Sequence, residues 1–566
     1  MNQLGGFPLL TLIVFLPVLG AVLSLFVRRE RGEALHWLAL LISVSDLFVT
    51  LFLYMGWEDD PLGGMQFVDG PWTWIAELGA NYHLGVDGIN LHLVLVAALL
   101  PPLLMLSCWL REGEAQHTKE NVFWMLLFEG GLLGALTALD VFLLSVFWLL
   151  AILAAFFLIG QGAHTPRAAA QFVVAAALVA VALLAITVGV SSATSGLDLA
   201  DPVEAELPRS VQTWMFWAAT LACGITGAIF PVHLWYPATE QQISPVTCIW
   251  VGSLLLNLGG YGLIRLCLSL SPLAATRFAP AMMVVGTLGL LYGGLAALGQ
   301  KTVSGALAYW RVAQMGLTAV GVFSMADLGL YGAIMNVAGG SLAAAALMLT
   351  CIDTGPGQRQ AGSAVPVSWA HRTALSLGFL STMGTPGLVG FTGQGLLVLG
   401  AARWPWQGGG SAATNGLWDW LWRGLIAGGV LLGVWALLRA WRRVRLGSAH
   451  QPARHALIVL PLLFLIVFAG IAPTLTSRIS SPSVHRLLIQ LRQGIERNRT
   501  PAFPSEVPEE DEKEPAALQV GNSPARQSTV RPGALTARAA TERVAGPLAI
   551  YAAPARPACA GREAGL

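Results

Sequence analysis

The stretch PVHLWYP, from Pro231 to Pro237, ends an apolar run that begins near residue 212. Proline removes a backbone donor and clashes with the preceding helical turn, so we expect a helix that breaks here. A second stretch, GTPGLVGFTGQG from Gly384 to Gly395, interrupts another apolar run. In a bilayer such breaks persist only where protein or a polar cavity satisfies the freed backbone groups. Two breaks in comparable places indicate an ion or substrate path, and the alternative for each is a kink that serves packing.

The composition around these breaks is that of an integral membrane protein. Of 566 residues, 55% are hydrophobic and 11% are charged, whereas a soluble domain carries about 25% charged residues. Apolar runs of about 18 to 25 residues can cross roughly 30 Å of hydrocarbon, and we predict about fourteen such helices. They lie near residues 7–27, 36–56, 88–110, 121–138, 139–160, 170–191, 212–236, 246–268, 279–299, 303–323, 328–352, 373–401, 424–441 and 455–473. The predicted fold class is all-α, with helices seven and twelve broken.

The charges of the short loops predict how the chain crosses the membrane. Most of the loop arginines fall on one side, whereas acidic clusters such as Asp59, Asp60 and Asp69 fall on the other. Basic loops tend to remain cytoplasmic, so both termini are predicted to lie outside the cytoplasm. We therefore expect a multi-pass protein of the bacterial inner membrane that contacts the lipid bilayer directly.

The chain is predicted to divide into four parts. Residues 1–110 hold the first three helices, residues 111–270 a first half with helices four to eight, and residues 271–475 a second half with helices nine to fourteen. Residues 476–566 combine an amphipathic helix, Val484 to Asn498, with a tail rich in Pro, Ala and Arg. The tail is predicted to be disordered because it cannot bury enough apolar surface to fold.

Several classes of function are excluded by what the sequence lacks. The six cysteines are scattered without a CxxC pair, and the ten histidines show no ligand spacing, so we expect no metal site. No glycine-rich dinucleotide motif follows a predicted strand, so we expect no cofactor and no catalytic redox residue in this chain. A net charge of +1 gives no reason to expect nucleic acid as a partner.

A set of motifs occurs in a fixed order between residues 80 and 400. They are LGVDGINLHLVLV (Leu84 to Val96), FEGGLLGALTALDVFLLSVFW (Phe128 to Trp148), FPVHLWYP (Phe230 to Pro237), GGYGLIR (Gly259 to Arg265), LAYWRVAQMG (Leu307 to Gly316) and GTPGLVGFTGQ (Gly384 to Gln394). Together they resemble the antiporter-like membrane subunits of respiratory complex I, and the M-type subunit most closely. The resemblance implies an antiporter-like fold with two inverted repeats. It also implies a place among other membrane-arm subunits of an NADH:quinone oxidoreductase, with NADH and quinone handled only by partner subunits.

In that family each such subunit is thought to carry one proton path built from charged side chains. The resemblance places its glutamate of span five, its lysines of spans seven and eight, and its acid or lysine of span twelve at Leu149, Thr226, Asn257 and Gln394. A histidine of span eleven falls on Gly339 or Gly340. None of these residues titrates, whereas a proton relay needs groups that hold and release a proton near working pH. We therefore predict a structural subunit that does not pump by the family's route.

Few ionisable or polar candidates remain at the predicted bilayer depth. Glu129 lies near the middle of span four and is either a functional acid or a protonated structural carboxyl. His233, in the first break, either titrates or bonds a freed carbonyl group. Lys301 is expected to extend its side chain to the cytoplasmic face, and Gln314 replaces a histidine of the family. These residues leave one alternative open: an ion-transporting subunit of a hydrogenase-like, cation/proton antiporter or inorganic-carbon uptake complex.

Overall fold

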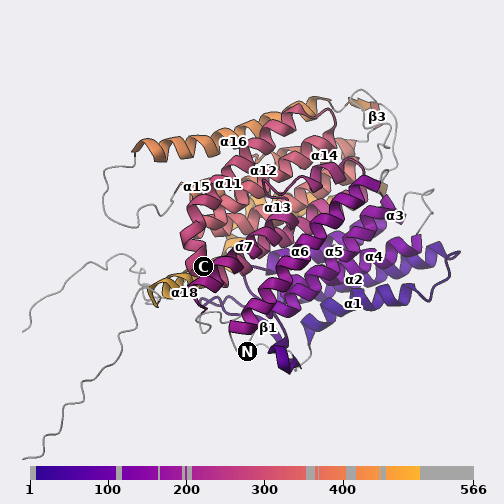
Figure 1. Ribbon diagram of the computed structural model, residues 1–566. Coiled ribbons are helices and arrows are strands. Elements are labelled where there is room, and N and C mark those ends of the chain that lie inside the picture. The colour runs from indigo at the N-terminus through magenta and orange to yellow at the C-terminus, as the bar shows by residue number, and fades with distance from the viewer. Residues whose placement is uncertain are drawn as a thin grey trace, which may run out of the picture. The chain divides into compact units, whose positions relative to one another are not determined.

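The computed structural model describes residues 8–109, 118–162, 166–193, 198–199, 207–351, 364–366, 369–402, 416–443, 445–447 and 454–497. Helices predominate in this part of the chain (Figure 1), and the predicted fold class is confirmed. Every predicted span coincides with one helix or with two helices separated by a break. By length and composition, 8 of the described helices can each cross a membrane, or up to 9 if a bent pair forms one span.

The first half of the chain leads up to the first break and past it. Its long helices are α1 (Leu9–Ser24), α2 (Gly32–Met55), α3 (Leu91–Trp109), α4 (Thr118–Thr137), α5 (Val141–Gly162), α6 (Pro166–Ala193) and α7 (Arg209–Thr226). The break is followed by α8 (Trp235–Glu240), α9 (Pro245–Ile249), η3 (Trp250–Leu255), α10 (Leu256–Gly262) and η4 (Leu263–Ser269). The last four of these form one continuous helix in which η3 and η4 are π-helical. The sequence pattern did not predict these wider turns.

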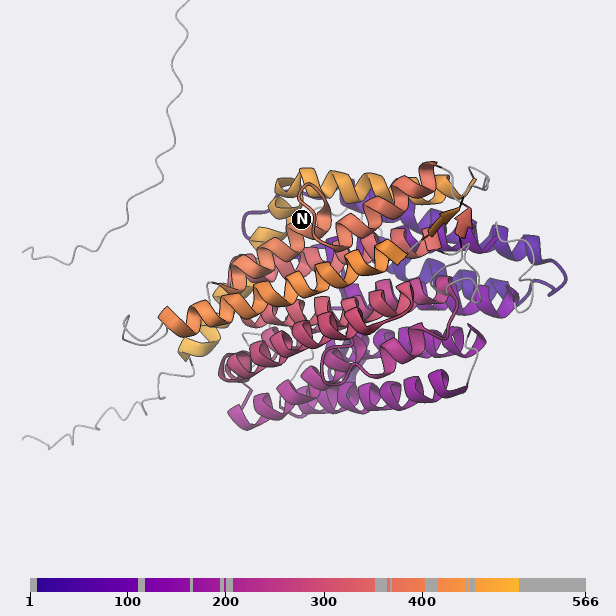
Figure 2. The ribbon, with the colours of Figure 1, turned by 90° about the horizontal axis from the view of Figure 1, so that it is seen from above.

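The second half contains the second break and the helix that ends the described chain. Its helices are α11 (Pro272–Gly299), α12 (Val303–Phe323), α13 (Asp327–Cys351), α14 (Trp369–Thr382), α15 (Val389–Ala401), α16 (Gly416–Arg443), α17 (Arg454–Ile471) and α18 (Pro473–Arg497). Two short strands, β3 (Ala364–Pro366) and β4 (Arg445–Gly447), pair in parallel. Seen from above, the helices of both halves pack alongside one another (Figure 2), and α13 is buried along almost its whole length.

Both predicted breaks are present, and the neighbouring side chains satisfy the backbone that they expose. Between α7 and α8, Ala228 has a φ of 51°, and Nε1 of Trp235 donates a hydrogen bond of 2.7 Å to the carbonyl oxygen of Ile225. Between α14 and α15, Gly384 and Gly387 have φ values of 75° and 86°, which glycine adopts without strain. The interruptions are therefore breaks in the helices rather than gentle bends.

A β-hairpin before α3 was not predicted. It consists of β1 (Gln66–Ile75) and β2 (Ala80–Val86), which pair antiparallel across a short 3-10 turn, η1 (Ala76–Leu78). The register shifts at several points, and β1 contains Gly70 and Pro71 in its middle. Because these irregularities interrupt the alternation of apolar and polar residues, the strand pattern was obscured in the sequence.

The predicted amphipathic helix after residue 476 is part of α18, which bends by 73° from α17. Leu487, Leu488 and Leu491 are buried against the rest of the fold, so the apolar side of this helix packs on the protein. The predicted tail, from residue 498 onward, lies outside the described residues. The division into four parts at residues 110, 270 and 475 stays a prediction.

Candidate functional site

The family positions on spans five and seven lie in a packed, neutral environment. Thr226 is the last residue of α7 and is 2% exposed. Its hydroxyl oxygen accepts a hydrogen bond of 3.2 Å from Nε1 of Trp148 on α5. Leu149, the next residue of α5, is partly buried and packs against the apolar core. An indole-to-hydroxyl hydrogen bond and an apolar contact therefore occupy the region where the resemblance expected a glutamate and a lysine.

The family position on span eight is also engaged by a neighbour. Asn257 lies on α10, and its Oδ1 accepts a hydrogen bond of 2.7 Å from Oγ of Ser341 on α13. Nη2 of Arg311, on α12, lies 3.5 Å from the same Ser341 oxygen. Ser341 therefore connects the neutral replacement of the lysine to a guanidinium that the sequence analysis did not single out.

Arg311 is buried, with only 5% of its surface exposed. Its Nε and Nη2 donate hydrogen bonds of 3.2 and 3.0 Å to the carbonyl oxygen of Gly252, in the π-helical stretch η3. An arginine keeps its proton in proteins, so this side chain places a permanent positive charge within the helix bundle. Arg311 stands inside the quoted motif LAYWRVAQMG, and its charge in an apolar run was the signal that could have identified it.

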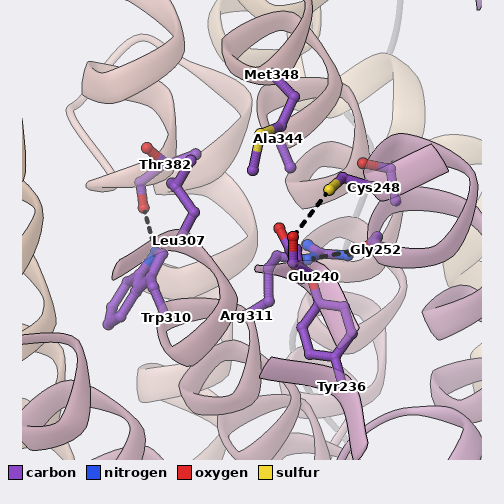
Figure 3. A pocket seen from close by; sticks show the side chains of 11 residues that line it. Tyr236, Glu240, Cys248, Gly252, Leu307, Trp310, Arg311, Ala344, Met348 and Thr382 are labelled. Carbon is purple, nitrogen blue, oxygen red and sulfur yellow. Dashed lines mark hydrogen bonds between the residues drawn. The ribbon is translucent and has the colours of Figure 1, made fainter. Parts of the chain in front are cut away.

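A cavity of about 20 Å³ adjoins Arg311 (Figure 3). A cavity of this size has room for about one water molecule. Eleven residues line it: Tyr236, Glu240, Cys248, Gly252, Ser253, Leu307, Trp310, Arg311, Ala344, Met348 and Thr382. Glu240 is 3% exposed and lines this cavity together with Arg311. The cavity therefore combines a buried acid and a buried arginine in largely apolar surroundings.

A side chain at either glycine of the span-eleven histidine position would require a neighbouring side chain to shift. A Cβ atom on Gly340 would lie 2.7 Å from Nη1 of Arg311, and one on Gly339 would lie 2.5 Å from Val389. A real Cβ atom essentially never approaches another heavy atom this closely. The guanidinium of Arg311 thus fills space on α13 that any side chain at Gly340 would need.

Gln394, the span-twelve position, has a structural contact. Its Nε2 donates a hydrogen bond of 3.1 Å to the carbonyl oxygen of Thr382, at the end of α14. Nε1 of Trp310 donates a second bond of 3.0 Å to the same oxygen. That carbonyl is freed by the second break, so these two donors satisfy backbone that the bilayer core could not.

The remaining candidates are scattered. Glu129 is fully buried on α4, and His233 is 2% exposed between the rings of Phe230 and Tyr292. Gln314 is buried on α12, and its side-chain amide has no hydrogen-bond partner in the described part of the chain. Lys301 is exposed just before α12 and does not take part in the buried polar region.

A buried ion pair joins the turn before α3 to η4, the end of the α9–η4 helix. Nη2 of Arg265 is 2.5 Å from Oδ2 of Asp87, and their side chains are 6% and 4% exposed. Oδ1 of Asp87 also accepts hydrogen bonds from the backbone nitrogens of Ile89 and Asn90, in the turn just before α3. The sequence analysis did not predict this ion pair.

A small number of buried ionisable side chains lie on the described helices that match predicted spans. Asp46, Glu129, Arg265 and Arg311 are all buried on helices that match predicted spans. Of these four residues, only Glu129 was predicted as a candidate from the sequence.

The chain is similar to known membrane proteins in sequence and in fold. Residues 138–413 match the family model described as NADH:quinone oxidoreductase/Mrp antiporter, transmembrane. The chain is 30% identical over 414 residues to NAD(P)H-quinone oxidoreductase chain 4 1 of Picosynechococcus, which covers 70% of this chain and 75% of that protein. It is 27% identical to the chloroplastic chain 4 of Mesostigma viride, with coverage of 84% and 96%. A chain of respiratory complex I from Thermus thermophilus shares the fold, with a TM-score of 0.73, 23% identity and coverage of 85% and 99%.

Proposed function

The chain belongs to the NAD(P)H-quinone oxidoreductase chain 4 family, and from this premise we propose that it is a membrane-arm subunit whose own central route does not conduct protons. The proposed assembly is a complex-I-like quinone oxidoreductase. Partner subunits would carry out the chemistry of the nicotinamide donor and of quinone. This chain would fill the membrane arm between its neighbours and seal it against lipid.

The proposal rests on the side chains at the four positions where the family is thought to carry charged groups. Thr226, Asn257 and Gln394 are neutral, buried and held in hydrogen bonds of 3.2, 2.7 and 3.1 Å. Leu149 has no polar atom in its side chain. Because none of these groups exchanges protons near working pH, the described side chains at these positions cannot pass a proton from one to the next.

The positive charge of Arg311 is a second reason to propose that the central proton route is closed. Its guanidinium lies within hydrogen-bond reach of Ser341, which itself bonds Asn257, so a fixed positive charge adjoins the former lysine position. Fixed positive charges in membrane pores exclude protons and cations. A route that ran through Asn257 would have to pass this charge, which supports a closed centre.

The exposed apolar surface suits a subunit of a membrane arm. Large side chains such as Phe48 on α2, Val181 on α6 and Trp435 on α16 are more than half exposed. Patches of this kind on a membrane protein meet lipid or a neighbouring subunit. We propose that the protein lies in a bacterial inner membrane with its basic loops in the cytoplasm and both termini outside.

Purification of the tagged full-length chain in a mild detergent tests this assignment. Co-migration of peripheral subunits that oxidise a nicotinamide donor and reduce quinone would support it, and an untagged strain is the matched control. Co-migration of hydrogenase or inorganic-carbon uptake proteins would contradict it. A chain that runs alone, at the mass of one subunit, would contradict it as well.

A further inference from the structure

Helix α2 carries a polar stripe that faces inward. Ser43, Asp46 and Thr50 are spaced three and four residues apart, so they share one face of the helix. All three are fully buried, whereas Leu41 and Phe48 on the same helix are exposed. The helix therefore directs its polar side chains away from the surface that its apolar residues present.

Glu129 on α4 meets this stripe. Its carboxyl is fully buried, and its Oε2 accepts a hydrogen bond of 2.7 Å from Oγ of Ser43. Asp46 lies one turn further along the same face of α2, and its carboxyl group interacts electrostatically with that of Glu129. The glycines after Glu129 allow close packing: a Cβ on Gly130 would lie 2.6 Å from Val18 of α1. The two acids are thus enclosed by tightly packed helices.

The oxygens of this cluster are under-satisfied. Both carboxyl oxygens of Asp46, Oε1 of Glu129 and Oγ1 of Thr50 are buried without a hydrogen-bond partner in the described part of the chain. A buried carboxylate needs donors or an opposite charge, and two carboxylates in one low-dielectric site cannot both remain ionised. Ser43 supplies one donor, and the described residues provide no donor for the remaining oxygens.

The elements that pack against the two acids carry other charged and titratable groups. They are Glu33, His36 and Tyr54 on α2, His92 and Cys108 on α3, Lys119 and Glu120 on α4, Tyr82 and His83 on β2, and Tyr261 on α10. The helices α1 and α5 contribute none. No positively charged side chain is hydrogen-bonded to either acid among the described residues. The cluster therefore lacks a cationic partner of its own.

We propose that Asp46 and Glu129 together bind one exchangeable proton, at a site separate from the central region around Arg311. A proton held by the pair removes one of the two negative charges and supplies the missing donor. A metal ion suits the site less well, because no group of three or more His, Cys, Asp or Glu that could hold one occurs among the described residues. The proposal concerns proton binding between α2 and α4, and it stands whether or not the central route is closed.

Infrared difference spectroscopy of the purified, lipid-reconstituted protein across a pH series tests the proposal. We expect a protonated-carboxyl C=O band that disappears as the pH rises and that is lost in the D46N/E129Q double variant. In D46N and E129Q alone the midpoint should shift by about one pH unit or more, because the two groups titrate as a pair. The matched control is Asp140→Asn, which removes a buried carboxyl whose oxygens accept three backbone hydrogen bonds.

Three results would overturn the proposal. A band that survives in the double variant would assign it to another carboxyl, and a band that never titrates would indicate a permanently protonated structural pair. A band that responds to Na⁺ but not to pH would indicate cation binding. If either acid variant fails to fold, Ser43→Ala replaces it: loss of the hydroxyl donor should shift the wild-type midpoint, and an unchanged midpoint would contradict the proposal.

Discussion

Arg311 and Gly340 are complementary: Nη1 of the arginine lies where a Cβ atom on the glycine would come within 2.7 Å. The glycine on α13 provides the space, and the guanidinium on α12 fills it. Arg311 is then held by the carbonyl oxygen of Gly252 and by Ser341. The contact between Gly340 and Arg311 therefore connects two family positions. Gly340 stands at the histidine position of span eleven, and Arg311 adjoins Asn257, which stands at the lysine position of span eight.

Gly340→Ala should destabilise the protein by about 1–3 kcal/mol, because the added methyl group must displace a guanidinium in a packed interior. The matched control is Gly395→Ala on α15, where a Cβ atom would meet nothing within 4 Å. That substitution should change stability by less than about 0.5 kcal/mol. Thermal unfolding in detergent measures both, and equal midpoints for the two variants would contradict the complementarity.

Asp87→Asn should cost about 3–5 kcal/mol, since it leaves the buried charge of Arg265 without its partner. Arg265→Met should be similarly costly, whereas the double variant should be less destabilised than the sum of the two. The double-mutant cycle by thermal unfolding gives the coupling energy directly. If the two single-variant losses in the free energy of unfolding add up in the double variant, the 2.5 Å ion pair contributes no coupling energy.

Leu149→Glu and Thr226→Lys should each lower stability, because each places one charge in packed surroundings. Thr226 is only 2% exposed, so a lone lysine there has little access to water. The double variant should be better tolerated than either single one, since the new acid and base can pair. Expression level and thermal stability are the readouts, and equal values for all three variants would refute this prediction.

The stability of the turn that follows Asp60 should depend on pH. Its carboxyl accepts hydrogen bonds of 2.9 and 2.8 Å from the backbone nitrogens of Leu62 and Gly64, and these bonds lower its pKa. The stabilisation is therefore complete above the unfolded value of about 3.9 and is lost as the pH falls through the lower folded pKa. Hydrogen exchange should show protection of these two amides that decreases in that window.

The control for Asp60 is its neighbour. Asp59→Asn removes an acid that pairs with the side chain of Arg478 and leaves the two amides bonded. It should keep the acid-dependent loss of protection, whereas Asp60→Asn should abolish that pH dependence. Protection that varies identically in both variants would assign the effect to another group.

The long apolar runs and the two breaks could be predicted from the sequence because each depends on local chemistry. Pro231 and Gly384 stand in the breaks after α7 and α14, and the runs set where each helix lies, although α11 and α16 begin before the predicted starts at residues 279 and 424. The hairpin of β1 and β2 could not be predicted, since its irregular register hides the alternation of side chains. The π-helical turns of η3 likewise have no simple sequence signature.

The interactions of the buried charged side chains could not be predicted from the sequence, for a different reason. Asp46 can be assigned to a cluster with Glu129 only from the packing of α2 against α4. This packing brings Ser43 to Glu129, 86 residues away in sequence. Likewise, the role of Gly340 follows from the position of Arg311 on another helix. Side chains that interact across helices cannot be matched from a single sequence without the packing that joins them.

The central claim is that protons do not cross this chain through its centre. The most direct test is the number of protons translocated per electron pair by the intact assembly in proteoliposomes. It compares the wild type with the Asn257→Leu and Gln394→Leu variants at matched electron-transfer rates. The account predicts an unchanged ratio in both variants. A lower ratio, with electron transfer intact, would show that protons pass through these positions and would contradict it.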